Sequence, residues 1–217
     1  MDSILGKAEE TLEKVQKLLS PMKSRPLDLI VLPECALIGY HFPNKSALFP
    51  LSESPDGWTF QQMSSIAKEF NSYVICGYVE KSLKSDINED CNEVDKYDLY
   101  NTAMLVDREG NLAFSYRKTF RFTVDKRYFT KGQGFSTTTI KNLDGDEFKI
   151  SIAICMDLNP DEESGASFEE FELGHYLREQ RIDLLVCLCA WVDSNPKINK
   201  IEEGLNTINY WVIRLLP

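Results

Sequence analysis

The segment at residues 149–160 constrains the fold more than any other, because an apolar run of strand length stops there at a cysteine. Its three isoleucines are β-branched and alternate with small residues, so the run predicts a buried β-strand. The run ends at Cys155, and Pro160 prevents a helix or strand from continuing unchanged. A cysteine in this position is either a buried core thiol or a nucleophile that an open sheet presents to a ligand.

Other apolar patterns place this strand in a larger α/β fold. Strands are expected at 27–32, 73–79, 100–106, 112–116 and 183–191, with a hairpin at 140–148 that leads into the cysteine strand. Apolar residues recur at helical spacing in 2–20, 58–70 and 168–180. Strands that alternate with helices, with hairpins among them, indicate a single α/β domain with a mixed sheet over residues 1–217.

Three segments do not fit this alternation. Residues 80–98 are rich in Lys, Asp, Glu and Asn and predict an exposed loop without a chemical role. Residues 119–136 are irregular, with many aromatic and basic side chains. From Asp193 the chain turns polar, before an apolar tail at 209–216.

The charge balance excludes several classes of partner. The chain has 24 Lys and Arg against 34 Asp and Glu, a net charge of -10, which argues against binding to nucleic acid or to an anionic membrane. No apolar run approaches the ~20 residues of a membrane helix. Residues 1–20 are charged and amphipathic, unlike a secretory signal, and too acidic for a transit peptide.

The six cysteines are scattered, which suggests reduced thiols in an intracellular protein rather than a disulfide framework. We expect a cytoplasmic protein, with nucleus and mitochondrion as open alternatives. There is no Cys-x-x-Cys pair and there are only two histidines, so neither a metal nor a cofactor is expected. A zinc site would have to join Cys187 and Cys189 to distant ligands.

Three of the expected strands each lead into a reactive side chain, namely Glu34, Lys118 and Cys155. If these strand ends meet, Glu34 can take the thiol proton as a general base. Lys118 would hold the thiolate and then the oxyanion of a tetrahedral intermediate, together with backbone N–H groups after the cysteine. Such a trio suits attack on an amide or nitrile.

Each member also has a purely structural explanation. Glu34 could be an acid near a helix N-terminus, Lys118 a surface cation at the end of a hairpin, and Cys155 a core thiol. Their occurrence together, each at a strand end, favours the catalytic interpretation.

The segments Leu32–Tyr40, Tyr116–Thr119 and Ile154–Asp157 resemble the Glu, Lys and Cys blocks of the nitrilase (carbon–nitrogen hydrolase) superfamily. Within it the chain is most similar to the fungal protein N-terminal amidases, through residues 114–120, 155–160, 190–191 and 209–217. Those enzymes convert N-terminal Asn and Gln of proteins to Asp and Glu for degradation by the N-degron pathway.

This resemblance implies a four-layer αββα sandwich, no metal, and an acyl-enzyme thioester. It assigns Glu34 as the base, Lys118 as the oxyanion stabiliser and Cys155 as the nucleophile. Many members carry a second glutamate after the lysine, and Asp125 stands at the matching place. Asp157 matches a family aspartate whose expected task is to bond the backbone of the turn. These two and Met156 are the candidate accessory residues.

The chain departs from the family pattern at both ends. It starts at the first helix rather than at a strand, and after Trp191 a short polar stretch leads almost directly to the tail motif. The resemblance therefore predicts a fold shortened at the N-terminus and near the C-terminus, with unpaired edges and exposed apolar surface. Such a chain would be a fragment, an alternative product, or dependent on a partner.

Three functions remain open on the sequence. The first is a thiol amidohydrolase that deamidates N-terminal Asn or Gln of proteins or peptides. The second is a small-molecule amidase of the ω-amidase or carbamoyl hydrolase type. The third is a truncated, non-catalytic remnant. An N-terminal amidase needs a carboxylate for the α-amine, and the sequence does not identify it, the preference between Asn and Gln, or the oligomeric state.

Overall fold

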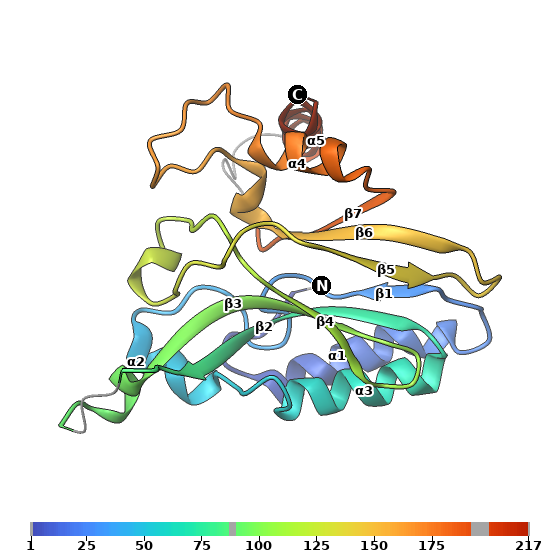
Figure 1. Ribbon diagram of the computed structural model, residues 1–217. Helices are drawn as coiled ribbons and strands as arrows, with labels where there is room; N and C mark the ends of the chain where they lie inside the picture. The colour runs from blue at the N-terminus through green and yellow to red at the C-terminus, as the bar shows by residue number, and fades with distance from the viewer. Residues whose placement is uncertain (1, 87–89, 192–199, 217) are drawn as a thin grey trace.

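The computed structural model describes residues 2–86, 90–191 and 200–216. Two β-sheets lie face to face, with helices on the outer side of each, so the chain forms four layers (Figure 1). The helices are α1 (Ala8–Leu19), α2 (Lys45–Leu48), α3 (Trp58–Phe70), α4 (Glu172–Gln180) and α5 (Lys200–Leu215). The strands are β1 (Leu29–Val31), β2 (Tyr73–Leu83), β3 (Tyr97–Val106), β4 (Leu112–Arg117), β5 (Thr137–Lys141), β6 (Glu147–Ile154) and β7 (Leu184–Leu188). The αββα architecture expected from the sequence is confirmed.

The first sheet has the order β1-β2-β3-β4. β1 pairs parallel to β2, whereas β2, β3 and β4 pair antiparallel. Along β2 the side chains alternate between the two faces. Val74 and Cys76 pack with α1 and α3, and Ile75 packs toward the second sheet. Because both faces are buried, the strand is a continuous apolar run.

The second sheet has the order β5-β6-β7, with β5 antiparallel and β7 parallel to β6. Its inner face, which includes Ile150, Ile152 and Ile154, packs against the first sheet. The parallel register pairs Ile154 with Leu188, so β6 and β7 end side by side. The residues that follow these two strands therefore start from the same edge of the sheet.

Several expected boundaries were wrong. The first helix begins at Ala8 rather than at residue 2, because Gly6 adopts a left-handed φ of 69°. α4 begins at Glu172 instead of Phe168. The polar stretch after Trp191 lies largely at 192–199, outside the described residues, and much of 200–216 forms α5.

The expectation of an exposed loop at residues 80–98 was also wrong at both ends of that range. β2 continues to Leu83 and β3 already begins at Tyr97. Glu80 is buried, accepts a hydrogen bond from Thr102 and forms an ion pair with Arg117. The charged composition of the segment concealed this buried carboxylate.

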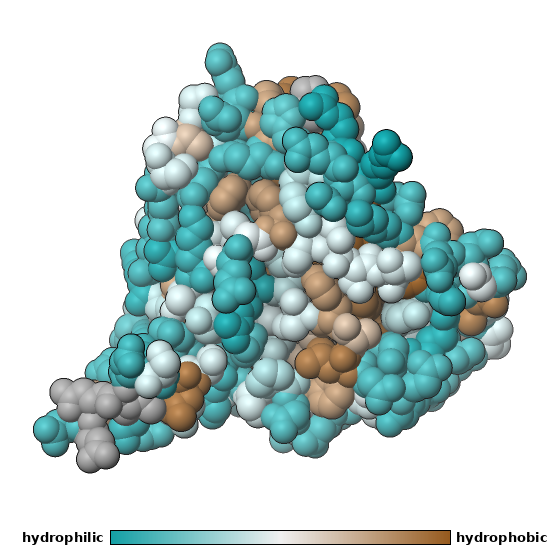
Figure 2. Space-filling view, viewed as in Figure 1, coloured by the Kyte–Doolittle hydropathy of each residue, from teal (hydrophilic) through white to brown (hydrophobic). Residues whose placement is uncertain are grey.

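Apolar side chains reach the surface at the sheet edges and on α5. In the described part of the chain, β1 and β7 each pair with one strand, and Val31 and Leu184 on them are 47% and 41% exposed. α5 also exposes apolar residues, namely Leu205, Ile208, Val212 and Ile213. Figure 2 shows apolar patches within a mostly hydrophilic face. None of the helices in the described ranges is long and apolar enough to cross a membrane.

Candidate active site

Cys155 lies on a sharp turn at the end of β6. Its φ of 46° is in the left-handed region, which residues other than glycine seldom adopt, and a short 3-10 helix, Cys155–Leu158, begins there. The turn breaks the strand alternation and leaves the thiol half-buried on a cavity of about 310 Å³. This is how a strand end presents a nucleophile.

Asp157 holds this turn in place. Its Oδ2 accepts hydrogen bonds from Ile154 N and Tyr116 Oη, both at 2.8 Å. Its Oδ1 accepts hydrogen bonds from Thr119 N at 3.0 Å and Phe120 N at 2.8 Å. Burial raises the pKa of Asp157 to about 6, although these hydrogen bonds act in the opposite direction. Three of the four donors to this carboxylate are backbone N–H groups, and Asp157 does not line the cavity.

Lys118 lies between two buried carboxylates. Its Nζ is 2.8 Å from Glu34 Oε1 and 2.7 Å from Asp125 Oδ2, and the three side chains are 2% exposed or less. Burial alone would lower the pKa of Lys118, but the charges of Glu34 and Asp125 outweigh it and raise the pKa. The lysine is therefore a fixed cation.

The carboxylate of Glu34 accepts hydrogen bonds from three donors. Besides Lys118, its Oε1 accepts a hydrogen bond from Asn101 Nδ2 at 2.7 Å, and its Oε2 accepts one from the backbone N–H of Ala190 at 2.8 Å. Sequence reasoning missed Asn101. One feature of the sequence could have identified it. An amide side chain within the apolar run of β3 is expected to be buried, and a buried amide needs a hydrogen-bond partner.

Asp125 connects Lys118 to the wall of the cavity. Its Oδ1 accepts a hydrogen bond from Tyr40 Oη at 2.6 Å, and its Oδ2 accepts one from Phe122 N at 2.8 Å. Tyr40 itself lines the cavity. The structure thus brings together Glu34, Lys118 and Asp125, which are far apart in the sequence.

A neighbouring thiol, that of Cys189, acts on Cys155. Cys189 Sγ itself lies 3.6 Å from Cys187 Sγ. The hydrogen bond with Cys189, burial and the charge of Glu34 raise the pKa of Cys155, whereas Lys118 lowers it. The resting group is a thiol rather than a thiolate, so its attack requires a base.

The cavity beside Cys155 has mostly apolar walls. Met156 lines it and is 8% exposed, and its Sδ accepts a 3.4 Å hydrogen bond from Asn159 Nδ2. The other lining residues are Tyr40, Phe122, Asn159, Glu162, Ala190, Trp191 and Tyr210. Among the described lining residues Glu162 is the one carboxylate, and none is Lys or Arg. Sequence reasoning did not place Phe122 or Glu162 here.

A second hollow, of about 390 Å³, adjoins the first and shares Tyr40, Ala190 and Trp191 with it. Glu34 and Cys189 also line this hollow. The buried Glu34 and the Cys189 thiol thus border a hollow next to the one that holds Cys155.

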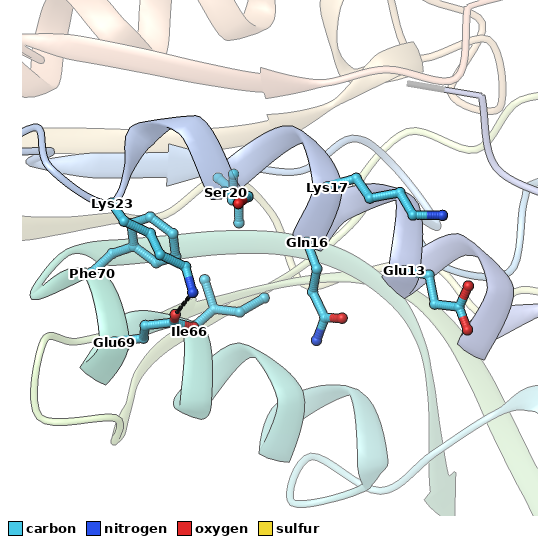
Figure 3. A pocket seen from close by; sticks show the side chains of 9 residues that line it. Glu13, Gln16, Lys17, Ser20, Lys23, Ile66, Glu69 and Phe70 are labelled. Carbon is cyan, nitrogen blue, oxygen red and sulfur yellow. Dashed lines mark ion pairs between the residues drawn. The ribbon is translucent and has the colours of Figure 1, made fainter.

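A third hollow lies far from these groups, between α1 and α3 on the outer helical layer (Figure 3). Lys23 Nζ and Glu69 Oε1 form a 2.6 Å ion pair there, with both side chains exposed. It contains charges of both signs and no thiol, so it does not offer comparable chemistry. No cluster of three or more potential metal ligands occurs among the residues that the structure describes.

A family model described as carbon-nitrogen hydrolase matches residues 2–166. The protein N-terminal amidase of Saccharomyces cerevisiae is 29% identical over an alignment of 215 positions that covers 92% of this chain and 44% of that protein. The protein N-terminal amidase of Schizosaccharomyces pombe is 29% identical over an alignment of 231 positions, gaps included, that covers 98% of this chain and 76% of that protein. A crystal structure of N-terminal amidase with an Asn-Glu-Ala peptide superposes with a TM-score of 0.75 at 27% identity, covering 98% of this chain and 51% of that one. The chain thus spans about half the length of two of these three proteins.

Proposed function

This chain belongs to the carbon-nitrogen hydrolase family, and we propose that it removes the side-chain amide of an N-terminal Asn or Gln residue of a protein or peptide. The products are ammonia and an N-terminal Asp or Glu, as in the N-degron pathway. The observation that carries the proposal is the buried Glu34–Lys118–Asp125 network beside a half-buried Cys155 thiol.

In the proposed mechanism, Glu34 accepts the thiol proton as Cys155 Sγ bonds to the amide carbon. The carbonyl electrons move onto oxygen, where Lys118 and backbone N–H groups of the turn stabilise the charge. The C–N bond then breaks, and the nitrogen leaves as ammonia with the proton from Glu34. Asp125 keeps Lys118 charged and oriented.

The resulting thioester is hydrolysed by water. Glu34 takes a proton from the water as the water oxygen bonds to the thioester carbon. The C–S bond then breaks, and Glu34 returns the proton to the sulfur, which restores the thiol. The acid product leaves with the added oxygen. The pathway requires no metal or redox step.

The charges around the cavity favour a peptide N-terminus over a small acidic amide. An ω-amidase or carbamoyl hydrolase substrate carries a free carboxylate near the amide, which calls for Lys or Arg in the pocket. The described residues lining the two adjoining hollows include carboxylates but neither Lys nor Arg. A peptide N-terminus brings a cation instead. All six cysteines are free thiols, as expected in the cytoplasm, where we place this activity.

The test is ammonia release from short peptides that begin with Asn or Gln. Matched controls are N-acetylated peptides, free asparagine and glutamine, and the Cys155→Ala protein. Release from free-amine peptides alone, abolished in the variant, supports the proposal. Release mainly from free glutamine or other small amides would move the function to a small-molecule amidase. Silence of a folded sample on every substrate would favour a non-catalytic protein.

A further inference from the structure

We infer that Glu162 is the residue that binds the α-ammonium group of the substrate, an inference that rests on the proposed function and assigns a specificity role within the same site. Chemistry demands such a group, because a protonated amine beside the scissile amide has to exchange water for another partner. In Asn the α-nitrogen is three bonds from the amide carbon, and in Gln it is four. The partner must therefore lie in the cavity that holds Cys155.

Glu162 meets this requirement by position. It lines the cavity together with Cys155, and among the described lining residues it is the one carboxylate. Its side chain is 54% exposed, so an entering ligand can reach it. Its charge also acts on Tyr210, another wall residue. Burial raises the pKa of Tyr210, Arg214 lowers it, and Glu162 raises it further.

The ion pairs around Glu162 show why it can accept a new cation. Three consecutive acids pair with basic residues of the loop at 121–131. Glu163 and Asp161 hold their partners at 2.6 Å. Glu162 lies 3.6 Å from Lys126, the longest of the three distances, and both side chains are well exposed. Such a pair contributes little, so its exchange for a substrate ammonium costs little.

The remaining walls suit a cation as well. Four aromatic side chains line the cavity, namely Tyr40, Phe122, Trp191 and Tyr210. Aromatic faces attract ammonium groups, and this attraction adds to that of the carboxylate. One carboxylate among aromatic walls is a suitable site for a single positive charge.

The test compares three variants on an Asn-initiated peptide. Glu162→Gln keeps the shape of the side chain and removes its charge, and it should lower kcat/KM about tenfold, mainly by raising KM. Glu163→Gln removes the neighbouring charge, which does not line the cavity, and should leave kcat/KM unchanged. Lys126→Gln removes the competing cation and should lower KM.

The opposite expected changes in KM, a rise for Glu162→Gln and a fall for Lys126→Gln, distinguish substrate recognition from a structural role. If the Glu162–Lys126 pair only held the loop, both substitutions would raise KM, and the inference would be overturned. The pH profile gives a second readout. In the unmodified protein, kcat/KM should fall as the substrate α-amine loses its proton, near pH ~8. Glu162→Gln should flatten this fall, and an unchanged profile contradicts the inference.

Failure of the inference is distinguishable from failure of the proposed function. If the unmodified protein deamidates peptides and Glu162→Gln behaves as Glu163→Gln, the assignment of Glu162 is wrong and the activity stands. If the unmodified protein releases no ammonia from any Asn or Gln peptide, both fall. Peptide affinity of the Cys155→Ala protein, measured by calorimetry with and without Glu162→Gln, should show the same tenfold difference.

Discussion

Two turns in this molecule share an unusual backbone and differ in what they present. The turn after β1 carries Cys35 with a φ of 45°, and the turn after β6 carries Cys155 with a φ of 46°. Cys35 is 1% exposed, whereas Cys155 lies on the cavity. A strained cysteine at a strand end is therefore not enough to identify a nucleophile. Access to a cavity makes the difference.

The two turns are also held by different means. The first rests on the backbone of Gly77, where a Cβ atom would approach Pro33 O to 2.6 Å and Glu34 Cα to 2.8 Å. The second is held by the carboxylate of Asp157. The first turn presents Glu34 and the second presents its own thiol. Lys118 connects them, because it contacts Glu34 and acts electrostatically on Cys155.

The largest expected effect on activity comes from replacing each of the two cysteines, Cys155 and Cys35, with alanine. Cys155→Ala should lower the rate of ammonia release by at least about 10³-fold, because the nucleophile is lost. Cys35→Ala should keep the rate within about threefold, since this thiol is closed off from the cavity. Circular dichroism checks that both variants are folded. Equal losses of activity would contradict the distinction between the turns.

Removal of the Lys118 cation, which connects the two turns, should strongly reduce the stability of the fold. Lys118→Met leaves Glu34 and Asp125 buried without their cation, and should lower the free energy of unfolding by about 3–5 kcal/mol. Lys7→Met removes an exposed i,i+3 pair and should change it by less than about 0.5 kcal/mol. Urea denaturation measures both. Similar small values for the two would mean that the buried network does not hold the turns together.

Asp157→Asn tests the support of the second turn alone. The new amide cannot replace all four hydrogen bonds, so the free energy of unfolding should fall by about 1–3 kcal/mol. The pH dependence has a defined sign. The folded-state pKa of about 6 lies above the unfolded value, so the folded state binds this proton more tightly.

Stability contributed by Asp157 is therefore greatest at low pH and declines as the pH rises toward 6. The difference in unfolding free energy between the original protein and the Asn variant should be larger at pH 4 than at pH 7. Thermal or urea denaturation of the pair at both pH values checks this. A larger difference at pH 7 would reverse the predicted sign.

The smallest effect concerns the reactivity of the second thiol. Cys189→Ala removes the hydrogen bond that raises the pKa of Cys155 most, so that pKa should fall. The rate of alkylation by iodoacetamide, followed against pH, reports the change as a shift of the profile to lower pH. A Cys91→Ala protein serves as the control, since that thiol lies outside the cavity. A shift to higher pH would contradict the assigned contact.

Sequence patterns predicted most of the strands and their ends, because buried strands appear as long apolar runs and a reactive side chain directly after such a run stands out. Glu34, Lys118 and Cys155 were selected in this way. The four layers were expected from the family resemblance. Asn101 and Glu80 were missed, since their partners come from other strands and depend on a register that no local pattern reveals. Glu162 lies in an acidic stretch whose three carboxylates differ by their partners, not by their composition.

The hydrogen bond from Ala190 to Glu34 joins residues 156 positions apart. A chain growing on the ribosome completes the first sheet, Lys118 and Cys155 long before Ala190 is made. Until then one oxygen of Glu34 lacks this donor, and long-range contacts of this kind form late in folding. The final arrangement of Glu34 therefore requires the strand that precedes Ala190, which is among the last parts of the second sheet to be made.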